Sequence, residues 1–173
     1  KSKPRIIVLN KSDLADDKAV KDWAETFRRQ GNKALAMNCM SGAGSKELFR
    51  LLSSMEAEKN KDKVRQKPYR LMIVGVPNVG KSTFTNRING AAIARTGDRP
   101  GVTRSNQWVR ITPYLELLDT PGLLWPNLSD QQDARALAFV GTINDNIMDQ
   151  QMLAIRLMER LMEDHADALA TRF

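Results

Sequence analysis

The chain has 173 residues, of which 42% are hydrophobic, and this is the size of one domain with at most a small appendage. No apolar run approaches the ~18 residues that a membrane-spanning helix needs, and the start has no signal-peptide pattern, so we expect a cytoplasmic protein without membrane contact. Cys39 is the single cysteine, which excludes an internal disulfide. The net charge of +7 indicates a polyanionic partner, of which nucleic acid is the commonest.

The first part of the chain predicts strands that alternate with helices. Apolar runs at residues 5–9 and 34–37 predict buried strands. One helix is expected over residues 16–30 and another from Ser45 onward. The expected packing face of the first helix consists of Val20, Trp23, Ala24 and Phe27. Residues 56–69 are mostly charged or polar, which predicts a helix end followed by a linker.

The pattern continues after the linker. A third strand is expected at residues 70–74 and a helix at 81–89. A loop rich in Gly, Arg and Thr follows, and then two adjacent strands at residues 107–111 and 114–118. From residue 130 onward the pattern is helical. Apolar residues recur there at helical spacing, and we interpret them as a packing stripe. The alternative is a functional methionine surface. The residues are Met148, Met152, Ile155, Met158 and Met162. Together, these strands and helices predict an α/β fold with a mostly parallel sheet and a C-terminal helical appendage.

Residues 75–82 match the phosphate-loop pattern G-x-x-x-x-G-K-S and lie between a predicted strand and a predicted helix. In such a loop, backbone N–H groups and the helix N-terminus bind phosphate oxygens. Lys81 is expected to reach the β- and γ-phosphates, where it assists catalysis, and Ser82 is expected to ligate Mg²⁺. The residues predicted to bind the nucleotide here are Pro77, Asn78, Val79, Gly80, Lys81, Ser82 and Thr83.

A second motif, Asp119-Thr120-Pro121-Gly122, follows the last predicted strand. Asp119 is expected to hold Mg²⁺ through a water. The Gly122 N–H can contact the γ-phosphate, so this segment can respond to its presence and is counted with the catalytic residues.

The loop at residues 90–104 is expected to supply a second hydroxyl ligand for Mg²⁺. Thr103 is favoured, because Pro100-Gly101 can form a turn that presents it, and Thr96 is the alternative. Thr103 is therefore a candidate metal ligand, nucleotide contact and catalytic residue.

Two polar segments at strand ends suggest recognition of guanine. Asn10-Lys11-Ser12-Asp13 ends the first strand, and Asp13 can accept hydrogen bonds from guanine N1–H and N2, donors that adenine lacks. Lys11 can cover the ring face, and Asn10 can connect the base with the phosphate loop. The second strand ends at Asn38-Cys39, where a backbone N–H, with Cys39 preferred, can donate to guanine O6. Together with the phosphate loop, these segments predict binding of GTP or GDP.

The order of the motifs is unusual, because the guanine segments precede the phosphate loop. An ordinary small GTPase has the reverse order, so the sequence predicts a circularly permuted P-loop GTPase fold. The join between the normal ends would fall in the linker at residues 56–69. We expect a GTPase domain at residues 1–128 and the start of a helical domain at 129–173.

These motifs in this order, together with residues 97–103, 119–126 and 137–145, resemble the YlqF/RbgA family of bacterial ribosome-assembly GTPases. The resemblance implies slow hydrolysis of GTP to GDP and phosphate, late assembly of the large ribosomal subunit, and binding to its precursor and rRNA. We also expect a monomer. The alternatives are a GTPase of another RNA-related process, and a nucleotide-gated RNA-binding module with incidental hydrolysis.

Three further expectations concern a neighbouring strand, the residue that orients the attacking water, and a potassium ion. The family has a strand and a helix before the first strand seen here, and that strand would lie in the sheet beside the phosphate-loop strand. Many GTPases orient the attacking water with a glutamine after D-x-x-G, whereas this chain has Leu123. In related GTPases an asparagine at the position of Asn78 accompanies a potassium ion, so K⁺ is a possible cofactor.

Overall fold

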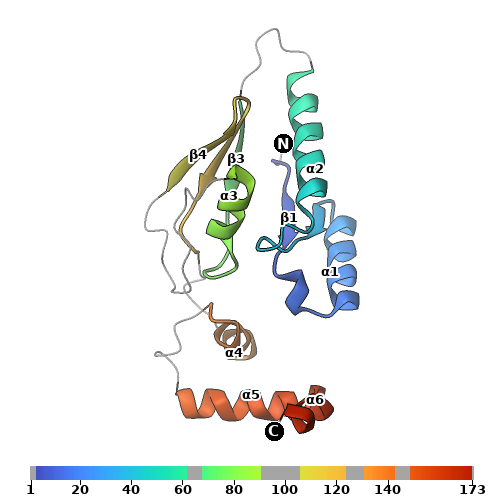
Figure 1. The fold of residues 1–173 in the computed structure, drawn as a ribbon, viewed down its shortest axis with the longest axis vertical. Coiled ribbons are helices and arrows are strands. Elements are labelled where there is room, and N and C mark those ends of the chain that lie inside the picture. Colours follow the sequence, from blue (N-terminus) through green and yellow to red (C-terminus); the bar gives the residue numbers. More distant parts are fainter. Residues whose placement is uncertain (1–2, 62–67, 91–105, 124–130, 143–148, 173) are drawn as a thin grey trace.

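The computed structural model describes residues 3–61, 68–90, 106–123, 131–142 and 149–172 (Figure 1). The strands are β1 (Ile6–Leu9), β2 (Lys33–Ala36), β3 (Tyr69–Ile73), β4 (Gln107–Thr112) and β5 (Leu115–Asp119). The helices are the 3-10 helix η1 (Ser12–Leu14), α1 (Asp17–Arg29), α2 (Ser45–Asn60), α3 (Lys81–Asn89), α4 (Gln131–Phe139), α5 (Gln150–Asp164) and α6 (Ala166–Arg172). Their bounds lie close to those predicted, and the α/β fold class is confirmed.

The N-terminal unit is a parallel pair, β1 and β2, with α1 packed against it. Asp16 begins α1 because its side chain accepts a hydrogen bond of 2.8 Å from the Ala19 N–H. Gly31 ends the helix in a left-handed conformation, with φ of 83°. Lys33 pairs with Ile6, so both strands end at the same edge, where the guanine segments follow.

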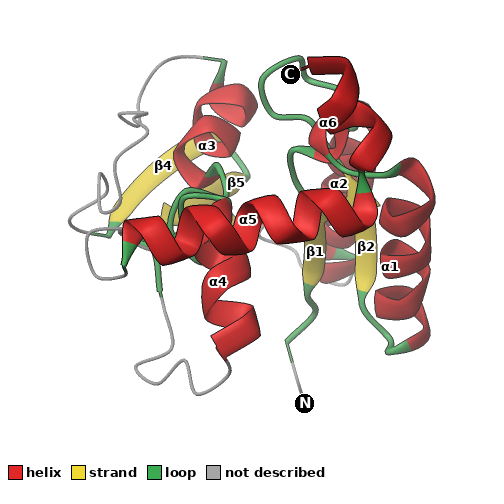
Figure 2. Ribbon diagram, turned by 90° about the horizontal axis from the view of Figure 1, so that it is seen from below, coloured by secondary structure: helices red, strands yellow, loops and turns green. Residues whose placement is uncertain are grey.

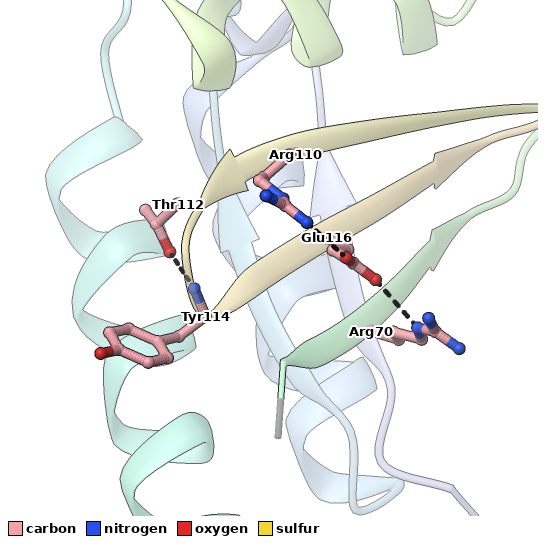
Figure 3. A network of polar contacts seen from close by, with 5 residues as sticks. All are labelled: Arg70, Arg110, Thr112, Tyr114 and Glu116. Carbon is pink, nitrogen blue, oxygen red and sulfur yellow. Dashed lines mark hydrogen bonds and ion pairs between the residues drawn. The ribbon is translucent and has the colours of Figure 1, made fainter. Parts of the chain in front are cut away.

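The second unit is a three-stranded sheet with the order β3-β5-β4. β3 runs parallel to β5, whereas β4 and β5 form an antiparallel hairpin. The Tyr114 N–H donates to Thr112 Oγ1 over 3.2 Å at the expected turn (Figure 3). Across the strands, Glu116 forms ion pairs with Arg70 at 2.9 Å and Arg110 at 3.8 Å (Figure 3).

Within the described residues the two sheets share no strand pairing, and they lie side by side in both views (Figures 1 and 2). A common hydrophobic core nevertheless joins the two units. Its buried members are Leu35, Met37, Cys39, Leu48, Leu52, Met55, Tyr69, Ile88 and Leu115. Burial of these side chains is the main favourable term that holds the units together.

The expected packing face of α1 is wrong at one position. Trp23 is 58% exposed, whereas Ala24 beside it is buried. The Trp23 ring lies 5.7 Å from that of Phe27, centroid to centroid, so it packs along its own helix. The face of α1 that meets the sheet is therefore narrower than its apolar stripe.

The C-terminal helices lie at one end of the molecule, where α5 passes beneath α4 and α6 follows its C-terminal end (Figures 1 and 2). The prediction that the apolar residues of α5 form a buried packing stripe is wrong among the described residues. Met152, Ile155, Met158 and Met162 on α5 are 45% to 64% exposed. The described parts of α4 and α6 meet only part of α5, so its apolar spacing is not matched by burial; Met148 lies outside the described residues. No helix in the described ranges has the length and apolarity to cross a membrane.

Candidate functional site

The phosphate loop lies between the end of β3 and the start of α3, as its sequence context predicts. Asn78 and Gly80 adopt left-handed conformations, with φ of 59° and 91°. A Cβ atom on Gly80 would lie 2.4 Å from Asn10 Nδ2, so the close approach of these two segments requires glycine. Ser82 and Thr83 follow in the first turn of α3 and are partly buried.

Lys81 projects into the phosphate loop. Its Nζ donates hydrogen bonds of 3.0 Å to the carbonyl oxygens of Gly75 and Val76. The residue is 9% exposed, and burial lowers the pKa of its ammonium group, while the charge of Asp119 acts in the opposite direction. The loop thus holds a positive charge among its own backbone groups, as phosphate binding requires.

Asp119 ends β5 and is 1% exposed. Within the described residues no hydrogen bond of normal geometry reaches either carboxylate oxygen, and the nearby Thr85 hydroxyl donates to Lys81 O instead. Burial raises the pKa of this carboxyl group, and the positive charge of Lys81 partly opposes the shift, as do the Thr120 backbone and the Thr85 hydroxyl, which lie near enough to lower the pKa slightly. A buried carboxylate without a donor is costly unless a cation accompanies it. This orphaned group fits Mg²⁺, although the described residues contain no cluster of three His, Cys, Asp or Glu side chains that could hold a metal alone.

The segment after Asp119 rests directly on the phosphate loop. The Thr120 hydroxyl donates to Ile73 O over 2.7 Å, and the Leu123 N–H donates to Gly75 O over 3.1 Å. Between them, a Cβ on Gly122 would lie 2.7 Å from Pro77 Cγ and 2.8 Å from its backbone. Gly122 therefore has no room for a side chain, and its peptide is held against the loop that binds phosphate in this motif.

Asn10 connects the two guanine segments, residues 10–13 and 38–44, with the phosphate loop. Its Nδ2 donates to Val79 O over 2.7 Å, and its Oδ1 accepts from the Cys39 N–H over 3.1 Å. One amide side chain thus joins both guanine segments and the phosphate loop, as its position in the sequence suggested. Lys11, in a left-handed conformation, and Asp13, in η1, are solvent-exposed next to it.

The second guanine segment, residues 38–44, folds around Asn38. Asn38 Oδ1 accepts the N–H groups of Met40 and Ser41 at 2.9 and 3.0 Å. The Cys39 N–H, expected to donate to guanine O6, already donates to Asn10, so a role toward the base requires that bond to open. The Cys39 thiol is buried, and burial raises its pKa to about 11, which makes it unreactive.

Two contacts of the site were missed by sequence reasoning. Arg87, in the last turn of α3, donates from Nε to Cys39 O over 2.9 Å and from a terminal nitrogen to Met40 O. Asn78 Nδ2 donates to Gly141 O, next to the end of α4. The sequence showed only that Arg87 has a long side chain and that Asn78 has an amide. Their partners are backbone carbonyl groups far away in the chain, which no residue type marks.

Two predicted positions lie at or beyond the limits of the described site. Thr103, its alternative Thr96 and the loop that contains them lie outside the described residues. Leu123 follows Gly122 and is 60% exposed. Its side chain has no polar atom and cannot orient water by hydrogen bonding.

Comparison with known proteins shows which family this chain resembles. The profile of the family described as 50S ribosome-binding GTPase matches residues 70–169. Ribosome biogenesis GTPase A from Bacillus cereus is 44% identical over 94% of this chain and 56% of its own length. The structure of GDP-bound YlqF from T. maritima has a TM-score of 0.63 at 31% identity, over 91% of this chain and 59% of that one. GNP-bound YlqF from T. maritima gives 0.64 at 32% identity, over 91% and 58%.

The chain therefore spans a little over half the length of the relatives it matches. Their names confirm the resemblance to YlqF and ribosome biogenesis GTPase A that the motifs and their order suggested. The matched region includes the phosphate loop, Asp119 and Gly122, whose geometry is described above. The chain belongs to the family of 50S ribosome-binding GTPases.

Proposed function

We propose that this protein binds GTP, hydrolyses it slowly to GDP and phosphate, and acts as a switch in late assembly of the large ribosomal subunit. The observation that supports this most directly is the Asn10 side chain, which bonds Val79 O in the phosphate loop and the Cys39 N–H in a guanine segment. A single ligand with phosphates at one end and a base at the other fits this arrangement. The membership in the 50S ribosome-binding GTPase family supports the assignment of guanine nucleotides and of the ribosomal partner.

Base selection in this proposal rests on Asp13, which is exposed at the start of the site and accepts the two donors of the guanine edge. Lys11 covers the ring, and the backbone of Asn38 and Cys39 lies on the O6 side. Adenine has neither donor, so it would forgo two hydrogen bonds to a charged acceptor, each worth roughly 1.5–3 kcal/mol.

At the phosphates, Lys81 would exchange its bonds to Gly75 and Val76 carbonyls for phosphate oxygens, which are stronger acceptors. Ser82, Thr103 and Asp119 would hold Mg²⁺, which supplies neutralisation of phosphate charge. The Gly122 N–H, held against Pro77, would contact the γ-phosphate. Loss of that phosphate removes the contact, and this is how the segment after Asp119 would report hydrolysis.

Water orientation needs a group other than the residue after Gly122, since that residue is Leu123. Positioning of GTP, the charge of Lys81 and a group from the ribosome then remain as the sources of catalysis, which explains slow hydrolysis by the chain alone. Asn78 Oδ1 is the atom that would bind K⁺ beside the phosphates. Its Nδ2 donates to Gly141 O, so the amide plane is already fixed in direction.

We further propose two functional regions, a circularly permuted GTPase domain at residues 1–128, with its join at 56–69, and the start of a helical domain at 129–173. The partner would be the large-subunit precursor and its rRNA, bound by a cytoplasmic monomer without membrane contact. The net charge of +7 supports a polyanionic partner.

The proposal is tested by single-turnover GTP hydrolysis with and without large-subunit precursor particles. We expect hydrolysis that depends on Mg²⁺ and rises at least tenfold with the particles. Small-subunit particles are the control for nonspecific electrostatic stimulation. Equal stimulation by both particles would leave a GTPase but remove the assignment to the large subunit, and ATP hydrolysis at the same rate would remove the guanine assignment.

A further inference from the structure

The helix that begins at the phosphate-binding lysine also contacts the base-reading segment at its other end. Lys81 opens α3, and Arg87 lies in its last turn, six residues later and about 9 Å along the axis at 1.5 Å per residue. Near this end of α3, Arg87 bonds residues 38–44, which follow β2 in the other sheet. One short helix thus spans the site from its phosphate end to its base end.

Arg87 bonds two carbonyl groups of residues 38–44 and lies near a third residue, Gly42. Its Nε donates to Cys39 O over 2.9 Å, and a terminal nitrogen donates to Met40 O. A Cβ on Gly42, whose φ is 88°, would lie 3.5 Å from Arg87 Nη1, so the guanidinium also packs against the glycine turn. The planar fork of arginine presents its N–H donors in fixed directions, whereas a lysine ammonium is a compact point charge with three rotatable donors.

These bonds determine the direction of the backbone N–H groups in the segment. A trans peptide is planar, and its N–H points opposite to its C=O. Fixing Cys39 O and Met40 O from one side therefore directs the N–H groups of Met40 and Ser41 to the other side. There, Asn38 Oδ1 accepts both, at 2.9 and 3.0 Å. The two peptides are held from both faces, by Arg87 and by Asn38.

We propose that Arg87 is a positioning residue for base recognition: it fixes residues 38–44 on the phosphate-binding helix and so sets the distance and orientation between the base and phosphate subsites. The inference rests on the proposed guanine-binding function. Arg87 bonds the backbone of Cys39 and Met40 and acts on the base through them, so its loss should weaken recognition of the base and leave phosphate recognition unchanged. No other described side chain bonds the carbonyl groups of both Cys39 and Met40.

The test measures ligand affinity of the Arg87→Ala and Arg87→Lys variants for GDP, ADP and inorganic tripolyphosphate. For Arg87→Ala we expect GDP affinity to fall about tenfold through faster dissociation, with the preference for GDP over ADP reduced by a similar factor. Tripolyphosphate affinity should stay within about twofold. Arg87→Lys should recover part of the loss, because it keeps a positively charged donor but not the fixed directions of the guanidinium.

Arg28 provides a matched control. It lies in the last turn of α1, is exposed like Arg87, and donates from Nε and Nη2 to Ala34 O at 3.1 and 2.8 Å. Ala34 is near the start of β2, and residues 38–44 follow the other end of that strand. Arg28→Ala thus removes the same kind of contact away from the site, and we expect unchanged selectivity.

The outcomes separate the two proposals. If the unmodified protein does not prefer GDP to ADP, the guanine function itself fails. If it does prefer GDP, and Arg87→Ala keeps the same affinity and selectivity, the positioning role is refuted. Equal losses for GDP and tripolyphosphate, or equal losses in Arg28→Ala, would also refute it, because they indicate a general effect on folding.

Discussion

Asn10 offers a sharp perturbation of the site, because one side chain bonds both the phosphate loop and the second guanine segment. Asn10→Ala removes the bond to Val79 O and the bond from the Cys39 N–H. Asn10→Asp has nearly the same shape and keeps an acceptor for Cys39, but it places a carboxylate oxygen opposite the Val79 carbonyl. The pair of variants thus separates the loss of one contact from the loss of both.

The magnitude follows from the two bonds. A hydrogen bond contributes a net ~0.5–1.5 kcal/mol, so the alanine variant loses about 1–3 kcal/mol. If the whole effect falls on nucleotide binding, GDP affinity decreases about fivefold to 150-fold. Because both bonds connect parts of the folded chain, part of the loss should also lower the free energy of unfolding. Asn10→Asp should be no milder than Asn10→Ala, since two oxygens then face each other over what was a 2.7 Å bond.

The assay combines titration of a fluorescent GDP analogue with urea denaturation of the nucleotide-free protein. We expect both variants to bind GDP at least fivefold more weakly and to show an earlier midpoint of unfolding. GDP affinity within twofold of the unmodified protein in both variants would refute the reasoning. It would mean that the two bonds of Asn10 do not stabilise the binding geometry.

Four further outcomes are expected. Gly122→Ala should displace the segment after Asp119, because its Cβ would meet Pro77 at 2.7 Å; single-turnover hydrolysis should fall at least tenfold while GDP affinity changes little. Asp119→Asn should abolish Mg²⁺-dependent GTP hydrolysis yet stabilise the nucleotide-free protein. Burial raises the pKa of Asp119 in the folded state, so ionisation of this carboxyl group lowers the stability of the unmodified protein as pH rises above 3.8, the ordinary pKa of aspartate. Denaturation over pH 4–8 should therefore show that Asp119→Asn gains stability over the unmodified protein as pH rises. A difference in stability that does not change with pH would contradict this. Asp13→Asn should reduce GTP affinity at least tenfold and improve binding of xanthosine triphosphate, measured by competition. Hydrolysis should be faster in K⁺ than in Na⁺ at equal ionic strength, and Asn78→Ala should remove the difference.

The local chemistry of the site could be predicted from the sequence because it depends on short-range geometry. A strand, a glycine-containing loop and a helix are encoded by adjacent residues, so Lys81 could be placed at the start of α3. The end of β5 likewise placed Asp119, and the connection made by Asn10 followed from its motif. The positions of Asn10 and Lys81 in the structure agree with those expectations.

The remaining features depend on contacts that periodicity does not encode. Helical spacing shows which face of α5 is apolar, but burial requires a neighbouring element, and Met158 is exposed among the described residues. Trp23 satisfies the pattern of α1 and still lies beside the contact face. Arg87 bonds carbonyl groups 47 and 48 positions away, and every residue offers such a carbonyl. The sequence contained no signal to distinguish Cys39 and Met40 as its partners.

The two unpaired sheets have a consequence for how the protein responds to its ligand. No strand hydrogen bonds cross between them in the described residues, so their mutual stability comes from the apolar core and from a few polar contacts. Such an arrangement favours two cooperative units that can open separately. A nucleotide that binds both units adds its binding energy only when they are together, so its effect is on cooperativity as well as on total stability. Hydrogen exchange should accordingly show different opening energies for β2 and β5 without nucleotide, and these should converge as GDP is added.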